Sequence, residues 1–206
     1  MSRLMPREAP EQEAPHRRAR ERVRAGGRSE DVRRRVAQAC LDLLAEGHAG
    51  FGPVDVARRS GVSRATLHRW WPTKADLLRE ALSLHTRDLT VEDTGSWARD
   101  VGALAHRMAG FFDDPVEVGQ NALMASGDHP DHTAAVLAHY ETLFDAWRAL
   151  FRRARERGEV ADGIEADAVL LTLASPLVLV PLLFRRRISG GEVDAVVALV
   201  LRSTAP

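Results

Sequence analysis

The stretch "SGVSRATLHRWWPTKADLL", residues 60–78, holds a glycine turn, a helix cap and a proline close together. Gly61 can end one helix, because glycine adopts the left-handed backbone conformation readily. Ser63 can cap the next helix, over residues 64–71, which ends there because Pro72 disfavours helical dihedral angles at the preceding residue. The stretch therefore predicts two helices that are joined by a short turn.

Apolar residues at helical spacing extend this pattern in both directions. The segment Thr73-Lys74-Ala75-Asp76 is a capping box with Asp in place of Glu, and it opens a further helix. That helix carries Leu77, Leu78, Ala81, Leu82 and Leu89. Upstream, the spacing predicts a helix over residues 30–46 and a short one that starts at Pro53.

Two helices around a glycine-containing turn, with one helix before and one after, are the arrangement of a helix-turn-helix DNA-binding unit. On a helical wheel Leu67 and Trp71 share one side, whereas Ala65, Arg69 and, less fully, His68 turn away from it. We therefore expect the first pair in the core and the second group on a face that can enter a groove. For Trp70 the sequence allows two roles, a phosphate contact through its indole N–H or simple helix packing.

The distribution of charge agrees with a DNA-binding half. The chain has 29 basic and 29 acidic residues, but residues 1–87 hold 18 basic and 11 acidic ones, a net charge of +7. Residues 88–206 carry the opposite net charge. Such an asymmetry suggests that the first part faces a polyanion.

The start of the chain differs from the rest. Residues 1–28 are rich in proline and arginine and almost lack large apolar residues, so we expect a disordered basic tail. Whether residues 17–28 form a solvated tail or an arm in the DNA minor groove stays open. The single cysteine, Cys40, lies on an apolar stripe and is expected to be a core thiol. With one cysteine and no targeting pattern, we expect a cytoplasmic protein with no membrane partner.

The second half also shows helical spacing. Apolar stripes and caps predict helices over about 96–112, 116–126, 133–157, 164–187 and 190–203. The fold class is therefore all-α, with a helix-turn-helix domain over 29–90 and a larger helical domain over 91–206. The last two predicted helices are so apolar that a monomer would expose them, so we expect a homodimer through residues 164–203.

A ligand, if one binds, is expected between the helices of 96–112, 116–126 and 133–157. The candidate lining residues are Trp97, His106, Met108, Asn121, Met124, His139, Tyr140 and Trp147. The segment "DHPDH", residues 128–132, is expected to start a helix rather than to bind a metal, because it lacks further ligands at a recognised spacing. No catalytic set and no cofactor motif is recognisable, so we expect neither an enzyme nor a cofactor.

The stretch "RRRVAQACLDLLAEGHAGFGPVDVARRSGVSRATLHRWWPTKADLLREAL", residues 33–82, resembles the N-terminal domain of TetR/AcrR-type transcriptional regulators. The resemblance rests on the apolar first helix with its Glu-Gly end, the "VA" pair, the Gly-Val-Ser turn and the lysine before Leu-Leu. It implies an all-helical homodimer whose recognition helices read a palindromic double-stranded DNA operator. It also implies a C-terminal domain that binds a small molecule and dimerises.

Carried over position by position, the resemblance assigns DNA contacts to Ser63, Arg64, Ala65, Thr66, His68, Arg69, Trp70 and Lys74. Arg64 and Arg69 are candidates for guanine edges, because a guanidinium pairs bidentately with O6 and N7. Lys74 is expected at a phosphate. His68 replaces the usual tyrosine of the family, and Gly52-Pro53 replaces the threonines that normally cap the second helix.

The sequence thus predicts a DNA-binding transcriptional regulator, a repressor released by an unknown small molecule. The alternatives are a DNA-binding dimer without an inducer and an enzyme that uses the C-terminal helical cavity.

Overall fold

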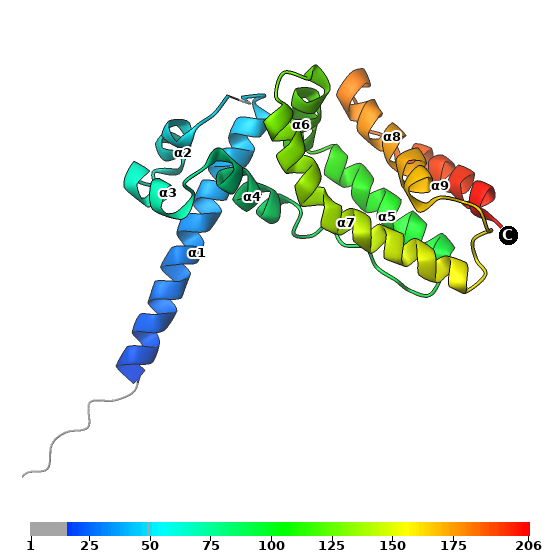
Figure 1. The fold of residues 1–206 in the computed structure, drawn as a ribbon, viewed down its shortest axis with the longest axis horizontal. Coiled ribbons are helices and arrows are strands. Elements are labelled where there is room, and N and C mark those ends of the chain that lie inside the picture. The colour runs from blue at the N-terminus through cyan, green and yellow to red at the C-terminus, as the bar shows by residue number, and fades with distance from the viewer. Residues whose placement is uncertain (1–15, 49) are drawn as a thin grey trace, which may run out of the picture.

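The computed structural model describes residues 16–48 and 50–206, and within these ranges it contains nine α-helices and no strand (Figure 1). The helices are α1 (His16–Ala45), α2 (Pro53–Ser60), α3 (Arg64–Trp70), α4 (Lys74–His85), α5 (Trp97–Phe112), α6 (Pro115–Ser126), α7 (Pro130–Glu156), α8 (Ala166–Phe184) and α9 (Gly190–Thr204). Helices α1–α4 gather at one end of the molecule and α5–α9 at the other (Figure 1). The expected all-α class, with a helix-turn-helix unit ahead of a larger helical part, is confirmed.

Helix α1 is longer than expected. It begins at His16, not near residue 30, and its first part projects beyond the other helices (Figure 1). The sequence predicts a disordered tail over residues 1–28, whereas the structure includes residues 16–28 in this helix. Residues 1–15 lie outside the described ranges. The segment "HRRARERVRA", residues 16–25, is rich in arginine and also holds alanine and glutamate, all of which have high intrinsic helix propensity.

The first core lies among α1, α2, α3 and α4. α1 packs against both α2 and α4, and α2 packs against α3. Its fully buried members include Val36, Cys40, Leu44, Phe51, Val56, Leu67 and Leu77. Burial raises the pKa of the Cys40 thiol to about 12, so Cys40 is the packed core residue that the sequence predicts.

The turn between α2 and α3 has the predicted caps. Gly61 follows α2 with a φ of 68°, in the left-handed region that glycine enters without strain. The Ser63 side chain accepts a hydrogen bond from the Thr66 backbone N–H at 3.2 Å and so begins α3. Helix α3 ends at Trp70, one residue before the expected end.

Helix α4 begins with the predicted capping box. Thr73 Oγ1 accepts from the Asp76 backbone N–H at 3.2 Å, and Asp76 Oδ2 accepts from the Thr73 backbone N–H at 3.1 Å. The helix ends at His85, so Leu89 lies beyond it and packs on the second core instead.

The second core lies among α5, α7, α8 and α9. The Trp97 ring lies 5.5 Å from the Trp147 ring and 5.4 Å from the Phe151 ring, measured between centroids. Both indole N–H groups have acceptors inside the chain: Trp97 Nε1 donates to Thr204 Oγ1, and Trp147 Nε1 donates to the Ala166 carbonyl, each at 2.9 Å. These bonds fix the two large rings in the core without an unsatisfied donor.

The predicted helices of the second half match α5–α9 to within a few residues. Helix α7 starts earlier than expected, at Pro130, because proline fits the first turn of a helix. Ser96 is placed by the sequence as the cap of α5, but its side chain makes no capping hydrogen bond in the structure. The Trp97 backbone N–H donates instead to the Glu159 carboxylate.

Helix α8 is long and apolar enough to cross a membrane, judged by length and composition alone. Core helices of soluble proteins pass the same test, and α8 is buried through Val169, Leu173, Leu177 and Pro181. Its other side is exposed: Leu171 is 69% exposed and Leu179 is 44% exposed. α8 therefore has one face in the core and one apolar face that no residue within 16–48 or 50–206 covers.

The two ends of the molecule meet where α1 crosses α6. A Cβ atom added to Gly119 would lie 2.3 Å from the Leu44 carbonyl oxygen, closer than real Cβ contacts allow. Only glycine therefore lets the backbones of α1 and α6 approach this closely. The crossing fixes the helix-turn-helix unit to the second half.

Replacement of Gly119 by alanine is expected to lower the free energy of unfolding by about 1–3 kcal/mol, because the Cβ overlaps the backbone of α1. Gly110→Ala is the matched control: Gly110 is an exposed helical glycine with nothing within 4 Å of an added Cβ. It should raise stability by roughly 0.5–1 kcal/mol. Urea unfolding of both variants measures the difference, and equal changes would contradict the close crossing.

Candidate nucleic-acid interface

Helix α3 has one buried side and one exposed side. Leu67 is fully buried and Trp71, which follows the helix, is 4% exposed. The outer side presents Ser63, Arg64, Ala65, His68, Arg69 and Trp70, all of them exposed. Thr66 is half-buried, because its hydroxyl lies 3.0 Å from the Ser63 hydroxyl at the cap. The side that the helical wheel assigns to a groove is thus the exposed side.

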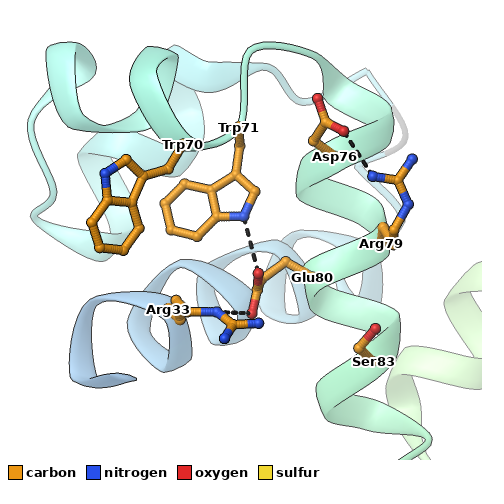
Figure 2. Close-up of a pocket in the computed structure, with 7 residues that line it drawn as sticks. All are labelled: Arg33, Trp70, Trp71, Asp76, Arg79, Glu80 and Ser83. Atoms are coloured by element: carbon orange, nitrogen blue, oxygen red, sulfur yellow. Dashed lines mark hydrogen bonds and ion pairs between the residues drawn. The ribbon is translucent and has the colours of Figure 1, made fainter. Parts of the chain in front are cut away.

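Trp71 is held in place by a carboxylate behind the helix. Trp71 Nε1 donates to Glu80 Oε2 at 3.1 Å, and Arg33 Nε donates to Glu80 Oε1 at 2.9 Å (Figure 2). Glu80 therefore connects the residue after α3 to both α4 and α1. The expected core role of Trp71 agrees with this geometry.

Trp70 lies at the rim of a small hollow that Arg33, Trp71 and Glu80 also line (Figure 2). Its ring is tilted against the Trp71 ring, with centroids 5.6 Å apart, and it is 41% exposed (Figure 2). The indole N–H of Trp70 donates to no acceptor within residues 16–48 and 50–206. One edge of Trp70 thus packs and the other is available to a partner.

Charges near α3 divide into paired and unpaired groups. Arg58, Arg59 and Arg79 lie within ion-pair distance of Asp55, Glu46 and Asp76 respectively. Arg64 and Arg69 make no ion pair with any residue that the structure describes. The two unpaired guanidinium groups therefore project from the outer side of α3, where they raise the local positive potential.

Lys74 is the first residue of α4 and is half-buried. Its Nζ lies over the Phe51 ring, 5.0 Å from the centroid, and burial lowers the pKa of Lys74. The stem of the side chain thus packs on the core of the helix-turn-helix unit.

The eight residues expected to line a ligand site do not come together. Trp97, Met108 and Trp147 are buried members of the second core. His106 is exposed, with its Nε2 2.8 Å from Asp194 Oδ1 on α9. The other four, Asn121, Met124, His139 and Tyr140, lie half-buried on α6 and α7.

Three of these four belong to a polar cluster around Glu117, which is 1% exposed. Tyr140 Oη donates to Glu117 Oε1 at 2.9 Å, and Gln120 Nε2 donates to Tyr140 Oη at 3.0 Å. Asn121 Nδ2 donates to the Glu117 carbonyl at 2.8 Å. Burial, and then the Glu117 charge, raise the pKa of Tyr140, so its hydroxyl remains a donor.

The cluster also reaches helix α4. His85 Nε2 lies 3.1 Å from Glu117 Oε1, and the Thr86 hydroxyl lies 2.9 Å from His139 Nε2. The sequence did not indicate His85, Thr86, Glu117 or Gln120 as members of a site. The one available signal was the carboxylate of Glu117 and the amide of Gln120, one turn apart on α6. These contacts join the end of α4 to α6 and α7.

The "DHPDH" segment starts α7, as expected. His129 occupies the N-cap position, and His132 is buried with no hydrogen bond to its ring nitrogens. Burial, and then the charge of Lys74, lower the pKa of His132, so the ring is neutral. Across residues 16–48 and 50–206, no group of three or more histidine, cysteine or acidic side chains is placed to hold a metal ion.

Comparisons with known proteins agree with this geometry. Residues 91–200 match the family model described as the tetracyclin repressor-like C-terminal domain. The chain is 31% identical over 153 residues to the HTH-type transcriptional regulator AqdR of Rhodococcus erythropolis, which covers 73% of this chain and 74% of that protein. It is 41% identical over 64 residues to the HTH-type transcriptional repressor LfrR of Mycolicibacterium smegmatis, 31% of this chain and 33% of that protein.

A solved structure has the same fold. The crystal structure of the TetR family transcription regulator SCO0332 superposes with a TM-score of 0.65 at 25% sequence identity. The match covers 85% of this chain and 100% of that one. The similarity thus extends over both halves of the molecule.

The support behind α3 can be tested at Glu80. Glu80→Ala leaves the Trp71 indole N–H without its acceptor, and the free energy of unfolding should fall by about 1–3 kcal/mol. Glu92→Ala removes an exposed carboxylate that pairs with Arg107, and should change stability by less than about 1 kcal/mol. Both are measured by urea unfolding. Equal stability of the two variants would rule out the supporting role of Glu80.

Proposed function

Because the chain belongs to the TetR family of helix-turn-helix transcriptional regulators, we propose that it is a repressor that binds a palindromic operator as a homodimer. We propose further that a small molecule releases it from DNA. One observation carries the DNA-binding part: α3 exposes two unpaired arginines on one side, while Leu67 and the anchored Trp71 hold the other. The repressor in the name of LfrR supports the negative sign of regulation.

The proposed roles on DNA follow the chemistry of each side chain. Arg64 and Arg69 read guanine edges in the major groove, because their guanidinium groups are exposed and unpaired among the described residues. Lys74 contacts a phosphate. Ser63, Ala65, Thr66, His68 and Trp70 complete the proposed contact surface.

The homodimer is proposed to form through residues 164–203. The exposed apolar side chains of this region are Leu171, Leu179, Leu183 and Phe184 on α8 and Leu199 on α9. Thr172 and Ser175, on the same side of α8, donate their hydroxyl protons to carbonyls of the preceding turn, so they leave no polar group unsatisfied. A second copy would cover this apolar surface.

The proposed division of labour assigns residues 29–90 to DNA binding and residues 91–206 to ligand binding and dimerisation. In this scheme a ligand that shifts α6 or α7 also shifts α4. The link is the polar cluster of Asn121, His139 and Tyr140, which reaches His85 and Thr86 at the end of α4. Such a shift changes the distance between the two recognition helices of a dimer.

A DNA-binding dimer without an inducer is the second candidate. It is favoured by the packing of the expected pocket: Trp97 and Trp147 are buried with their indole donors satisfied, and Tyr140 is held by Glu117. An enzyme receives no such support. Release of the protein from DNA by a small molecule separates the two DNA-binding candidates.

DNA binding is tested by titration of the protein against the DNA upstream of its own gene and of the neighbouring genes. We expect binding that weakens steeply as the salt concentration rises, because cationic side chains displace counterions from phosphates. If the protein showed no salt-dependent binding to any of these fragments, the proposal that it is a DNA-binding regulator would be contradicted.

Two substitutions separate base reading from phosphate contact. Arg69→Ala should lose the preference for particular base pairs, at about 1–3 kcal/mol for each guanine contact. Lys74→Ala should weaken binding to all operator variants and reduce the slope of log K against log salt by about one. Fluorescence anisotropy with a set of operator variants measures both. Arg99→Ala, an exposed arginine on α5, is the control and should behave as the unmodified protein. An equal loss for every operator variant after Arg69→Ala would exclude base reading by Arg69.

The dimer can be broken by a charge on the exposed side of α8. Leu179→Glu should shift the protein to a monomer, because dimerisation would then bury an unpaired carboxylate. Leu137→Glu is the matched control, since Leu137 on α7 is 46% exposed and Leu179 is 44% exposed. Sedimentation equilibrium measures the mass of both. A Leu179→Glu variant that stays dimeric would place the interface elsewhere.

A further inference from the structure

A cleft of about 680 Å³ opens where α1, α6 and α8 meet, outside the bundle of α5, α6 and α7. Figure 1 shows α6 between the end of α1 and α8. The lining comes from the end of α1 (residues 45–47), from Asp113 and α6, and from the end of α8 (Pro181 and residues 185–187). The volume falls in the range of about 300–1,000 Å³ that small-molecule sites occupy.

One residue of this lining is strained. Arg185 follows α8 with φ 53° and ψ 36°, in the left-handed region, and it is the only residue other than glycine with a positive φ in the described ranges. Glycine or asparagine is usual at such a helix end, because a side chain with a Cβ atom is disfavoured there. An arginine in this conformation carries a backbone cost that a useful side chain would offset.

The charges of the cleft leave one cation without a partner. Glu46 pairs with Arg59 at 2.7 Å, Asp113 pairs with Arg187 at 2.6 Å, and Arg186 holds both oxygens of Glu192, at 2.9 Å and 2.7 Å. Arg185 makes no ion pair or hydrogen bond with the residues that the structure describes. The cleft therefore has one positive charge to offer an anion.

The rest of the wall is largely apolar. Pro115, Val118, Ala122 and Leu123 line it from α6, and Pro181 lines it from α8. Such a wall favours the apolar body of a ligand, since burial of apolar surface is favourable at about 25 cal/mol per Å². One cation beside an apolar wall selects for a molecule that has one anionic end.

The cleft lies on the inward side of α8. Pro181 continues the buried stripe of Leu173 and Leu177, spaced four residues apart. Leu171 and Leu179 lie on the opposite, exposed side, because two residues along a helix correspond to about 200°. A second copy that covers Leu171 and Leu179 therefore leaves the Pro181 side of α8 uncovered.

We propose that this cleft binds a small monoanion with an apolar body, such as an aryl or alkyl carboxylate, and that Arg185 holds the carboxylate. The proposal rests on the proposed function and names the chemical class of its ligand. Because residues 45–47 end α1, a bound molecule touches the helix that carries the DNA-binding unit and, through Val118 and Ala122, the helix that crosses it.

The probe is 4-phenylbutyrate, compared with its neutral amide, and binding to the full-length protein is measured by calorimetry. The acid should bind at least about tenfold more tightly than the amide, because only the carboxylate can form a bidentate ion pair with the Arg185 guanidinium. Arg185→Gly should weaken binding of the acid about tenfold. The same variant should fold at least as stably as the unmodified protein, because glycine relieves the strained conformation.

Two controls define the site. Arg99→Ala removes an exposed arginine elsewhere and should leave binding unchanged, whereas Ala122→Trp, at an exposed position on α6, should fill the cleft and abolish binding. The proposal is overturned if neither compound binds, if acid and amide bind equally, or if Arg185→Gly binds as before. DNA titration of the same samples distinguishes the two proposals. If the protein binds DNA but not the acid, only the proposed ligand site is contradicted. If no sample binds DNA, the proposed regulatory function is contradicted.

Discussion

The close crossing of α1 and α6 is the constraint on which the arrangement of the molecule depends. Gly119 lets the α6 backbone reach the Leu44 carbonyl, and α1 also packs on α2 and α4. One helix therefore carries the first core and contacts the second half directly. A change in the position of α6 cannot leave the DNA-binding unit unaffected, because packed helices move as rigid bodies with few alternative arrangements.

The polar cluster around Glu117 fixes the position of α6 at this junction. A buried carboxylate is unfavourable unless several donors satisfy it, so Tyr140 and Gln120 must be at their places when α6 is in this position. Apolar packing would tolerate small sliding of α6, whereas these bonds tolerate little. The cluster thus specifies one register of α4, α6 and α7.

The exposed side of α3 depends on what lies behind it. A helix of seven residues has little stability of its own, so α3 is positioned by the Ser63 cap, by Leu67 and by the bond from Trp71 to Glu80. The adjacent tryptophans have different roles. Trp71 is buried and anchors the end of α3 in the core, whereas Trp70 lies at the exposed rim of the hollow behind the helix. Arg64 and Arg69 of α3 make no ion pair within the described residues, because the nearby carboxylates of Asp55 and Asp76 pair with other arginines.

The sequence alone predicts the all-α class, the helix-turn-helix unit and most helix ends, because caps such as Ser63 and periodic apolar residues act over a few neighbouring positions. It also separated Trp71 from the outer side of α3. It misplaced the start of α1, where helix propensity replaces apolar spacing. The folded arrangement was needed to show that Trp97, His106 and Tyr140 lie in three different places, that Gly119 must be a glycine, and that Arg185 lines a cleft. Those facts depend on which helices meet, and contacts between residues far apart in the chain leave no periodic signal in it.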